Sequence, residues 1–432
     1  MKIFFTIIFI AVSSAQLLAQ TNNSPYSILG IGDIEDSYFN RTSGLANTGI
    51  AYRSGRYLIN NNPASFSALD NDFFAGEIGG KAKFVNYYGG NVSASANQSF
   101  DISFRKIVFG IKPSKHWGSS FGLLPFSTQS YEFNSPLLIG GTSGESANQY
   151  FNGSGGLNKI YWANSYEFFH HLSLGVSASY LFGTFKQKII LQDPATQAEL
   201  ASTNNNANLY NVYLDYGVQL YGKLGSKWNY SLGATYANKT KLIADVSQIV
   251  LAPDSSQLYQ SSYSSSYFNL PVSIGAGIAL TYKKKYTFLA DYKIQNWQSV
   301  KNTQYANNSI LNSGGYNYYL QNSSRLSAGV EISNQRTVSM GQYNAIVELM
   351  FFQAGFYYTN SYLNVFGQQI KDIGGTFGVG VNSKRTPLAY CLSFQYGVKG
   401  VQNVQLIQEK YFGFTLSISY RDYWLTKGRK FF

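Results

Sequence analysis

The strongest pattern in this chain is an alternation of apolar and polar residues with a period of two. Between residues 211 and 221, Val212, Leu214, Tyr216, Val218 and Leu220 alternate with Asn211, Tyr213, Asp215, Gln219 and Tyr221. The same alternation recurs at residues 100–105, 325–332 and 411–420. A period of two predicts β-strands with one apolar and one polar face. Soluble antiparallel sheets alternate as well, so this pattern alone does not identify a membrane protein.

The number and spacing of these segments distinguish the two kinds of sheet. About fourteen segments fit the pattern, at residues 72–85, 99–112, 116–128, 157–169, 171–186, 207–224, 227–243, 265–283, 285–297, 323–333, 343–358, 370–381, 388–398 and 410–420. Their connections alternate between long ones, at 129–156, 187–206, 244–264 and 298–322, and short ones, at 113–115, 170, 225–226 and 284. Outer-membrane barrels have short periplasmic turns and long external loops. We therefore predict an all-β fold, a closed antiparallel transmembrane β-barrel of about fourteen strands.

A barrel of this kind leads to further expectations about the membrane around it and about its lumen. The barrel should lie in the cell outer membrane, in contact with lipid and lipopolysaccharide, with both termini in the periplasm. A ring of about fourteen strands is too wide to fill with its own side chains. Small inward residues on several strands, such as Gly175, Gly277 and Gly378, leave room for another segment to enter. Interfacial girdles are expected from Trp117, Tyr161, Trp162, Trp228, Tyr230, Tyr286, Trp297, Tyr423 and Trp424.

Composition agrees with this interpretation. The chain has 432 residues, of which 44% are hydrophobic, 17% aromatic and only 12% charged. The charged fraction is about half that of a typical soluble protein. Beyond the first dozen residues there is no apolar run of about 18 residues, so helical membrane spans are not expected. The net charge is +12, but the Lys and Arg residues are scattered, and we expect no nucleic-acid partner.

The residues before the first strand fall into two parts. Lys2, an apolar run and small residues predict a signal peptide over residues 1–19, with cleavage after Ala15 or Ala19. Residues 20–71 mix apolar, polar and turn residues, and we expect them to lie in the lumen as a hatch, with the barrel formed by residues 72–432. The alternative is a short periplasmic tail.

Candidate chemistry is sparse. A polar luminal wall is expected from Glu77, Lys81, Asp101, Arg105, Asp215, Asp291, Lys293, Arg325, Glu331 and Glu348, whose charges can pair with one another or with Asp33, Glu35, Arg41, Arg53 and Arg56 of the hatch. His116, His170 and His171 sit at predicted turns without metal-ligand spacing, so we expect no metal. No catalytic constellation is present, and neither an enzyme nor a cofactor is expected. Cys391 is the only cysteine.

Short motifs at both ends carry a family resemblance. Asn62, Pro63 and Ala64 follow Asn60 and Asn61 and precede the first strand. They resemble the NPA motif that ends the hatch of the long-chain fatty-acid transporter (FadL-type) outer-membrane family, a feature shared by the related barrel subunit of the type IX secretion system. The two ends resemble Bacteroidota members through Ser24, Pro25, Tyr26, Gly30, Gly32 and Asp33, and through Glu409, Tyr411, Phe412, Asp422, Tyr423, Trp424 and a basic tail.

The resemblance implies two functions. Characterised transporters of this family pass apolar molecules through the barrel and out sideways at a kink in the third strand. Here the third strand contains Gly122 and Pro125, and a proline interrupts a ladder. A lateral opening beside Pro125 is one expectation, and a position above the bilayer is the other. The first functional hypothesis is a hatch-gated channel for hydrophobic small molecules. The alternative is a structural subunit of an outer-membrane secretion or assembly complex, with other outer-membrane proteins as partners.

Overall fold

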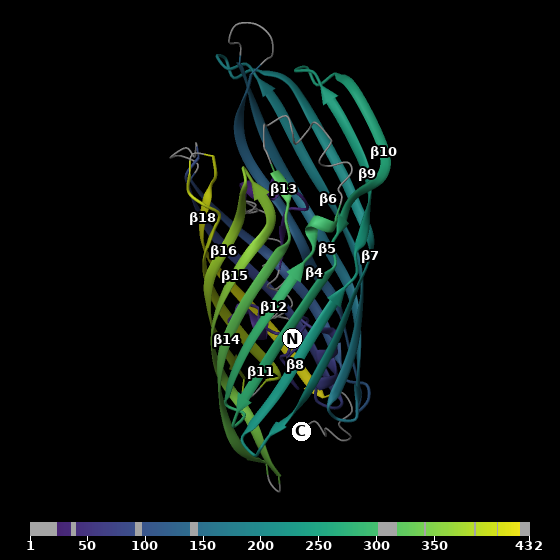
Figure 1. The fold of residues 1–432 in the computed structure, drawn as a ribbon, viewed down its shortest axis with the longest axis vertical. Coiled ribbons are helices and arrows are strands. Elements are labelled where there is room, and N and C mark those ends of the chain that lie inside the picture. The colour runs from purple at the N-terminus through teal and green to yellow at the C-terminus, as the bar shows by residue number, and fades with distance from the viewer. Residues whose placement is uncertain are drawn as a thin grey trace.

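The computed structural model describes residues 24–35, 40–90, 97–138, 146–300, 318–340, 343–383, 386–403 and 405–423. The signal peptide expected over residues 1–19 lies outside this range. The described residues form one antiparallel sheet that curves into a closed barrel, because the last strand pairs with the first strand of the wall (Figure 1). No helical turn among them has the length and hydrophobicity that a membrane-crossing helix requires.

The wall strands follow one another around the barrel in chain order. They are β2 (Phe73–Tyr88), β3 (Gln98–Ile111), β4 (Trp117–Leu138), β5 (Ser146–Phe168), β6 (Leu172–Gln192), β7 (Glu199–Leu224), β8 (Trp228–Ala237), β9 (Thr240–Leu251), β10 (Gln257–Leu270), β11 (Ser273–Tyr282), β12 (Tyr286–Gln295), β13 (Tyr318–Leu320), β14 (Ser323–Met340), β15 (Tyr343–Val365), β16 (Gln368–Asn382), β17 (Leu388–Lys399) and β18 (Gln408–Tyr423).

Three of the wall strands are interrupted and count as two elements each. Elements β8 and β9 both pair with β7, so together they form one strand of the wall. On their other side, β8 pairs with β11 and β9 pairs with β10, so β10 and β11 together form the next strand. Elements β13 and β14 both pair with β15 in the same way. The wall is thus a ring of fourteen antiparallel strands, which confirms the predicted fold class.

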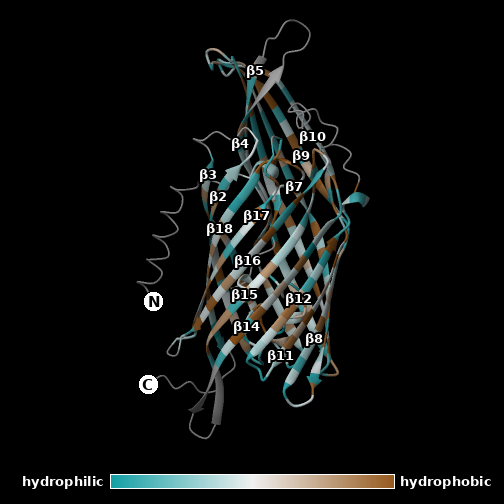
Figure 2. Cartoon of the chain, turned by 60° about the vertical axis from the view of Figure 1, so that its left-hand side comes forward, coloured by the Kyte–Doolittle hydropathy of each residue, from teal (hydrophilic) through white to brown (hydrophobic). Residues whose placement is uncertain are grey.

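The outer face of the barrel is apolar. On β7, Val212, Tyr216 and Leu220 are exposed on the outside, whereas Gln219 points inward and is completely buried. Figure 2 shows that hydrophobic and hydrophilic residues alternate along the strands of the wall. The apolar outer face is the inverse of a soluble protein, in which apolar side chains face the interior, and it matches the arrangement that a lipid environment requires.

Several strands extend far beyond this apolar belt. On β6 the outward face changes from the exposed Tyr180 to the exposed Lys186 and Lys188. Strand β7 has 26 residues, which at ~3.3 Å per residue and a tilt of about 45° is roughly twice the ~30 Å thickness of the hydrocarbon core. The segments expected as long loops at 129–156, 187–206 and 244–264 are therefore mostly strand. The hairpins β4–β5, β6–β7 and β9–β10 rise on one side as a tall wall (Figure 1).

Two of the expected girdle residues lie in the interior. Tyr161 and Trp297 are both 1% exposed. Tyr161 hydrogen-bonds Ser120 across the inner wall, and the ring of Trp297 stacks on that of Tyr362 with centroids 4.4 Å apart. Trp117 and Trp228, by contrast, are exposed near the short turns, where an interfacial girdle is expected.

Candidate functional site: the lumen and its N-terminal segment

Residues 24–35 and 40–71, here called the N-terminal segment, contact the inner face of the barrel. The segment contains η2 (Pro25–Ile28), β1 (Asp33–Ile34), α2 (Asn40–Ser43) and η3 (Pro63–Ala68). Its first part lies near the tall hairpins and its second part near the short turns, after which the chain enters β2. Most of its described residues are buried.

Glycines on the inner wall admit the backbone of this segment. A Cβ added at Gly233 would lie 2.3 Å from the carbonyl oxygen of Ile50, and one at Gly118 would lie 2.0 Å from that of Phe66. Real Cβ atoms do not approach so closely, so any larger residue would push the segment away. The small inward residues seen in the sequence thus create the room that the segment occupies.

The Asn-Pro-Ala motif sits where two of these glycines meet it. Asn62 is completely buried, and its side chain accepts from the backbone N–H of Ala64 at 3.0 Å, which caps η3. Its amide group donates to the carbonyl oxygens of Ile50, Val218 and Ala234. A Cβ at Gly175 would lie 2.3 Å from the amide nitrogen of Ala64, and one at Gly217 would lie 1.9 Å from Asn62 Oδ1.

A buried charge cluster fixes the middle of the segment. The guanidinium of Arg41 pairs with Glu331 on β14 at 2.5 Å and with Glu348 on β15 at 2.8 Å, and it donates to the hydroxyl of Tyr52. The Cζ atom of Arg41 lies 3.9 Å from the centre of the Phe351 ring. Burial alone would lower the pKa of this guanidinium, but Glu331 and the other acidic neighbours hold the pKa of Arg41 well above its ordinary value.

Other wall carboxylates and amides bind the segment's backbone. Asp291 on β12 accepts from the N–H groups of Gly49 and Ile50 at 2.6 and 2.9 Å. The amide of Gln219 donates to the carbonyl oxygen of Ile50 at 2.9 Å. Near the tall hairpins, Lys399 pairs with Asp33 at 2.6 Å. These contacts come from well-separated strands, so they hold the segment against much of the circumference of the barrel.

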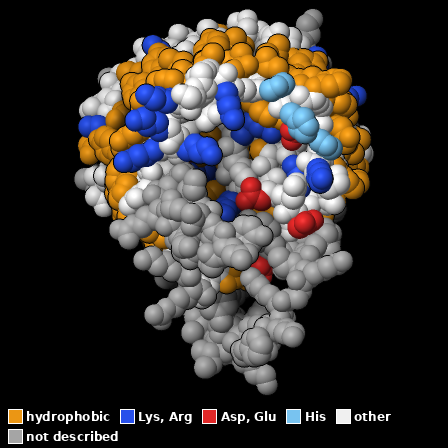
Figure 3. All heavy atoms as spheres, turned by 90° about the horizontal axis from the view of Figure 1, so that it is seen from below, with side chains coloured by type: hydrophobic (Ala, Val, Ile, Leu, Met, Phe, Trp, Pro, Cys, Tyr) orange, Lys and Arg blue, Asp and Glu red, His pale blue; other side chains and the backbone are white. Residues whose placement is uncertain are grey.

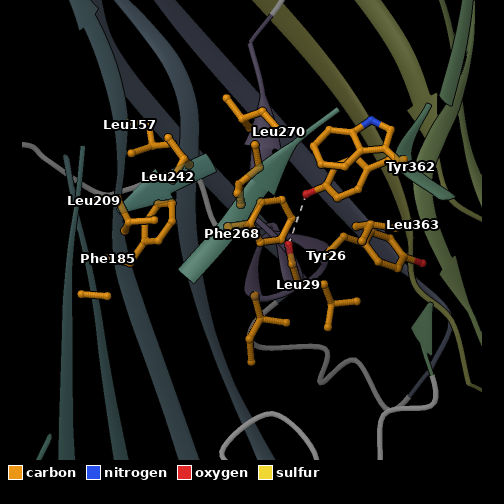
Figure 4. Close-up of a cluster of buried hydrophobic side chains, with 14 of the residues drawn as sticks. Tyr26, Leu29, Leu157, Phe185, Leu209, Leu242, Phe268, Leu270, Tyr362 and Leu363 are labelled. Carbon is orange, nitrogen blue, oxygen red and sulfur yellow. Dashed lines mark hydrogen bonds between the residues drawn. The ribbon is translucent and has the colours of Figure 1, made fainter. Parts of the chain in front are cut away.

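At the tall-hairpin end the interior is an apolar core. Tyr26, Ile28, Leu29 and Ile31 of the segment pack with wall residues from most of the surrounding strands (Figure 4). The wall residues of this cluster are Tyr131, Phe151, Leu157, Leu181, Phe185, Ala207, Leu209, Tyr213, Ala237, Leu242, Ala244, Phe268, Leu270, Trp297, Tyr362, Leu363, Val365, Ile370 and Leu406. The hydroxyl of Tyr362 donates to the carbonyl oxygen of Leu29 at 3.3 Å. Apolar side chains therefore fill this part of the lumen.

Among the described residues, small cavities lie in the middle of the barrel. One of about 180 Å³ is lined by Asp33, Glu35, Lys81, Lys83, Lys293, Arg325, Asp372 and Lys399, among others. The other, of about 150 Å³, is lined by charged residues that include Glu35, Lys159, Asp215, Asp291, Lys293 and Arg325. Both are smaller than a typical site for a drug-sized ligand, and both are lined by many charged residues, unlike most small-molecule sites.

A larger cavity opens at the short-turn end. It has a volume of about 1050 Å³, and its lining includes Arg53, Arg56, Lys223, Lys284, His170 and His171. Figure 3 views this end, where Lys and Arg side chains surround the hollow and histidines lie at one side of it. Arg53 lies 3.6 Å from the centre of the Tyr221 ring, and burial lowers the pKa of its guanidinium.

The ladder between β3 and β4 is the shortest among neighbouring full strands of the wall. It runs only from the pair Ile111–Ser119 to the pair Ile107–Leu123, although β3 continues along β2 and β4 continues along β5. Beyond Leu123, the edge of β4 pairs with β1 of the N-terminal segment, through Asp33 with Thr128 and Ile34 with Ser127.

Gly122 and Pro125 flank the end of this ladder. A Cβ at Gly122 would lie 2.5 Å from the carbonyl oxygen of Ile107, so the two strands are in close contact there. Pro125 opposes Asn158 on β5, and a β-bulge follows it. On β5, the outward residue next to Asn158 toward the short turns is the exposed Ile160. Pro125 thus lies at the upper edge of the apolar belt.

The structure places the sequence-predicted wall residues as follows. Glu77, Asp101 and Glu331 are buried on the inner face, and Lys81, Asp215 and Arg325 line the small cavities. The side chain of Arg105 lies outside the described part of the structure.

One buried wall pair was missed by the sequence analysis. Lys106 pairs with Glu77 at 2.9 Å, and neither side chain is exposed. A register shift between Gly79 and Gly80 brings Lys106 opposite Gly79 and turns it inward. Strict alternation could not have indicated this, because a bulge interrupts the period of two.

Comparisons with known proteins agree with this architecture. The model of the BamG family matches residues 1–431. No curated protein matches the sequence. The CymD monoaromatic hydrocarbon channel is similar in structure, with a TM-score of 0.59 and 13% identity over 90% of this chain and 98% of that one.

Two further solved structures share the fold. The Pseudomonas putida toluene transporter TodX has a TM-score of 0.59 and 13% identity, over 90% of this chain and 99% of its own. A Pseudomonas aeruginosa FadL homologue has a TM-score of 0.60 and 12% identity, over the same shares of the two chains. These three proteins are described as a hydrocarbon channel, a toluene transporter and a FadL homologue, and the likeness shows that the present chain shares their barrel fold.

Proposed function

This chain belongs to the BamG family, and from the contents of its lumen we propose that it is a structural subunit of an outer-membrane protein complex. The observation that carries the proposal is that the described residues fill the upper lumen with apolar side chains and leave only small charged cavities in its middle. An apolar core occupies the upper lumen, and the two small cavities below it are lined by charges such as Lys293 and Arg325. A hydrophobic molecule would have to displace packed side chains and then cross a charged region, which is costly.

The tall wall supports the same proposal. Hairpins β4–β5, β6–β7 and β9–β10 extend beyond the apolar belt, and the outer face of β6–β7 there carries polar residues such as Lys186, Lys188 and Asn208. A rigid, hydrogen-bonded wall above the membrane is a surface on which other outer-membrane proteins can dock without an ordering cost. We propose such proteins as the partners, with outer-membrane lipid and lipopolysaccharide around the belt.

A mild-detergent pulldown of the full chain from its native cells tests this function. We expect other outer-membrane proteins in stoichiometric amounts. A variant in which a two-residue turn replaces residues 245–264 of the β9–β10 hairpin should keep the barrel but lose any partner that docks on this hairpin. Recovery of the wild-type chain alone, from cells in which it supports uptake of an apolar solute, would overturn the proposal.

We also propose that the N-terminal segment is the hatch, residues 20–71, of a barrel formed by residues 72–432. Its bonds to Glu331, Asp291 and Gln219 support a plug that stays in place at rest. Deletion of residues 24–64 should raise the leakage of small solutes through reconstituted barrels. A normally inserted barrel with unchanged permeability would contradict the plug.

The second candidate is a channel for hydrophobic small molecules with a lateral exit. The short β3–β4 ladder favours it, because backbone groups of β4 beyond Leu123 are satisfied by β1 rather than by β3. Movement of β1 would then open the wall beside Gly122 and Pro125, at the upper edge of the apolar belt. CymD is a monoaromatic hydrocarbon channel and TodX a toluene transporter, and this candidate extends that activity to the present chain.

A disulfide lock tests the lateral exit. Cysteines at Ile34 and Ser127, which pair across β1 and β4, should block uptake of toluene until a reductant is added. The matched control places cysteines at Thr281 and Thr287, whose hydroxyls lie 3.1 Å apart in the opposite wall, and should leave uptake unchanged. Equal uptake by the locked and reduced proteins would exclude an exit that depends on β1.

A further inference from the structure

We propose that His116, Glu167 and His170 form a binding site for a borderline divalent cation of the zinc class. The three residues come from two short turns at the same end of the barrel. His116 immediately precedes β4, Glu167 lies at the end of β5, and His170 lies in the turn between β5 and β6. The site stands beside the large cavity, which His170 helps to line.

The potential ligand atoms already converge. One atom from each of the three side chains lies within 4.8 Å of the other two. The rings of His116 and His170 have centroids 5.4 Å apart, and Nδ1 of His170 lies 3.4 Å from a carboxylate oxygen of Glu167. Zinc holds its nitrogen and oxygen ligands at ~2.0–2.2 Å, which places neighbouring ligand atoms about 3.4 Å apart. Rotation of the exposed His170 side chain can supply much of the required contraction.

The backbone holds the two turns in this arrangement. The N–H of Glu167 donates to the carbonyl oxygen of His116 at 2.9 Å, one step beyond the pair Trp117–Tyr166. His170 has a positive φ of 59°, as does Phe169 before it, at 51°. Such left-handed backbone is unfavourable for bulky residues and marks a turn whose geometry its surroundings impose.

His116 carries the argument beyond an ordinary surface ion pair. Its Nδ1 atom is buried and has no hydrogen-bond partner among the described residues. Such an atom normally finds a partner, so an unsatisfied one calls for an explanation. A pair between His170 and Glu167 would not use the His116 ring, whereas a cation between the three side chains would.

The donor set identifies the class of cation. Two imidazoles and one carboxylate suit zinc and its borderline neighbours better than magnesium or calcium, which prefer oxygen ligands only. Three protein ligands leave a coordination position for water or for a group of a partner. The cation would tie the β3–β4 turn to the β5–β6 turn, directly below the short ladder between β3 and β4. It would thereby stiffen a part of the wall that few strand pairs support.

Calorimetric titration with Zn²⁺ tests the site on the full mature barrel in detergent, stripped with a chelator and carrying a purification tag without histidines. We expect one Zn²⁺ per chain. His116→Ala, Glu167→Gln and His170→Ala should each weaken binding by at least about tenfold, since even second-shell changes cost ~10–100-fold. His171→Ala is the matched control, because its ring contacts the carbonyl oxygen of Tyr221 instead, and it should bind like the wild type.

A spectroscopic measurement separates a built site from loose surface binding. Co²⁺ in the wild type and in His171→Ala should give the visible absorption of a four-coordinate ion, and this band should be absent in His116→Ala. The heat-modifiable mobility of the folded barrel verifies that each variant has folded. No stoichiometric Zn²⁺ binding, or equal binding by all four variants, would overturn the proposal.

Discussion

The N-terminal segment is held in two different ways at its two ends. Near the tall hairpins, Tyr26, Ile28, Leu29 and Ile31 pack in a large apolar cluster. Near the short turns, residues 40–70 pack in two smaller apolar clusters, and charge pairs, hydrogen bonds to the backbone and contact with wall glycines hold them in addition. Apolar packing is non-directional and scales with buried area, whereas buried polar contacts fail when one partner is lost.

This difference indicates separate tasks for the two ends. The apolar end excludes water and tolerates changes that conserve volume. The polar end specifies one position of the segment, since its partners lie on strands far apart around the barrel. We therefore expect single substitutions at the polar end to release the segment and comparable ones at the apolar end to be milder.

Loss of the charge cluster should have the largest effect. Arg41→Met leaves Glu331 and Glu348 buried beside an apolar side chain, and breaking a buried pair costs about 3–5 kcal/mol. Hydrogen–deuterium exchange over residues 40–70 should accelerate strongly while the wall strands stay protected. Adding Glu331→Gln should restore part of the protection, because it removes one uncompensated charge. Unchanged exchange in Arg41→Met would mean that the cluster does not hold the segment.

Obstruction of the glycine surface should have an intermediate effect. Gly175→Ala places a methyl group 2.3 Å from the amide nitrogen of Ala64, and such overpacking costs about 1–3 kcal/mol. We expect faster proteolysis near Asn62 in the folded barrel. Gly413→Ala is the matched control, since its Cβ would meet no atom closer than 3.4 Å. If both variants resist protease equally, the segment does not depend on this close contact.

The smallest effect is expected at the apolar end. Tyr26→Phe keeps the ring but removes the hydroxyl that donates to the carbonyl oxygen of Ile407 at 2.6 Å, a bond worth about 1 kcal/mol. Exchange over residues 24–35 should rise slightly, and residues 40–70 should remain as in the wild type. Release of the whole segment by this change would contradict the division between the two ends.

Much of the fold was predictable from the sequence. Alternation is a property of each strand on its own, so the segments around Asp215 and Arg325 could be recognised without knowing their neighbours. The prediction of long loops at 129–156, 187–206 and 244–264 was wrong, because the alternation of apolar and polar residues changes above the lipid. There Lys186 and Lys188 face outward and apolar residues such as Phe185 face inward, so the outer face no longer has the pattern of a membrane strand.

A closed barrel with an apolar exterior can be predicted from the chain's residues alone, because period-two patterning and low charge follow from local chemistry. Which charges meet depends on how the strands are arranged in space. Arg41 and Glu331 are separated by 290 residues, and a bulge turns Lys106 inward toward Glu77. The closeness of the two histidines also depends on strand pairing, since His116 and His170 lie on different turns that become neighbours only when β4 pairs with β5. Contacts of this kind arise from the register and closure of the sheet, which no short stretch of sequence contains.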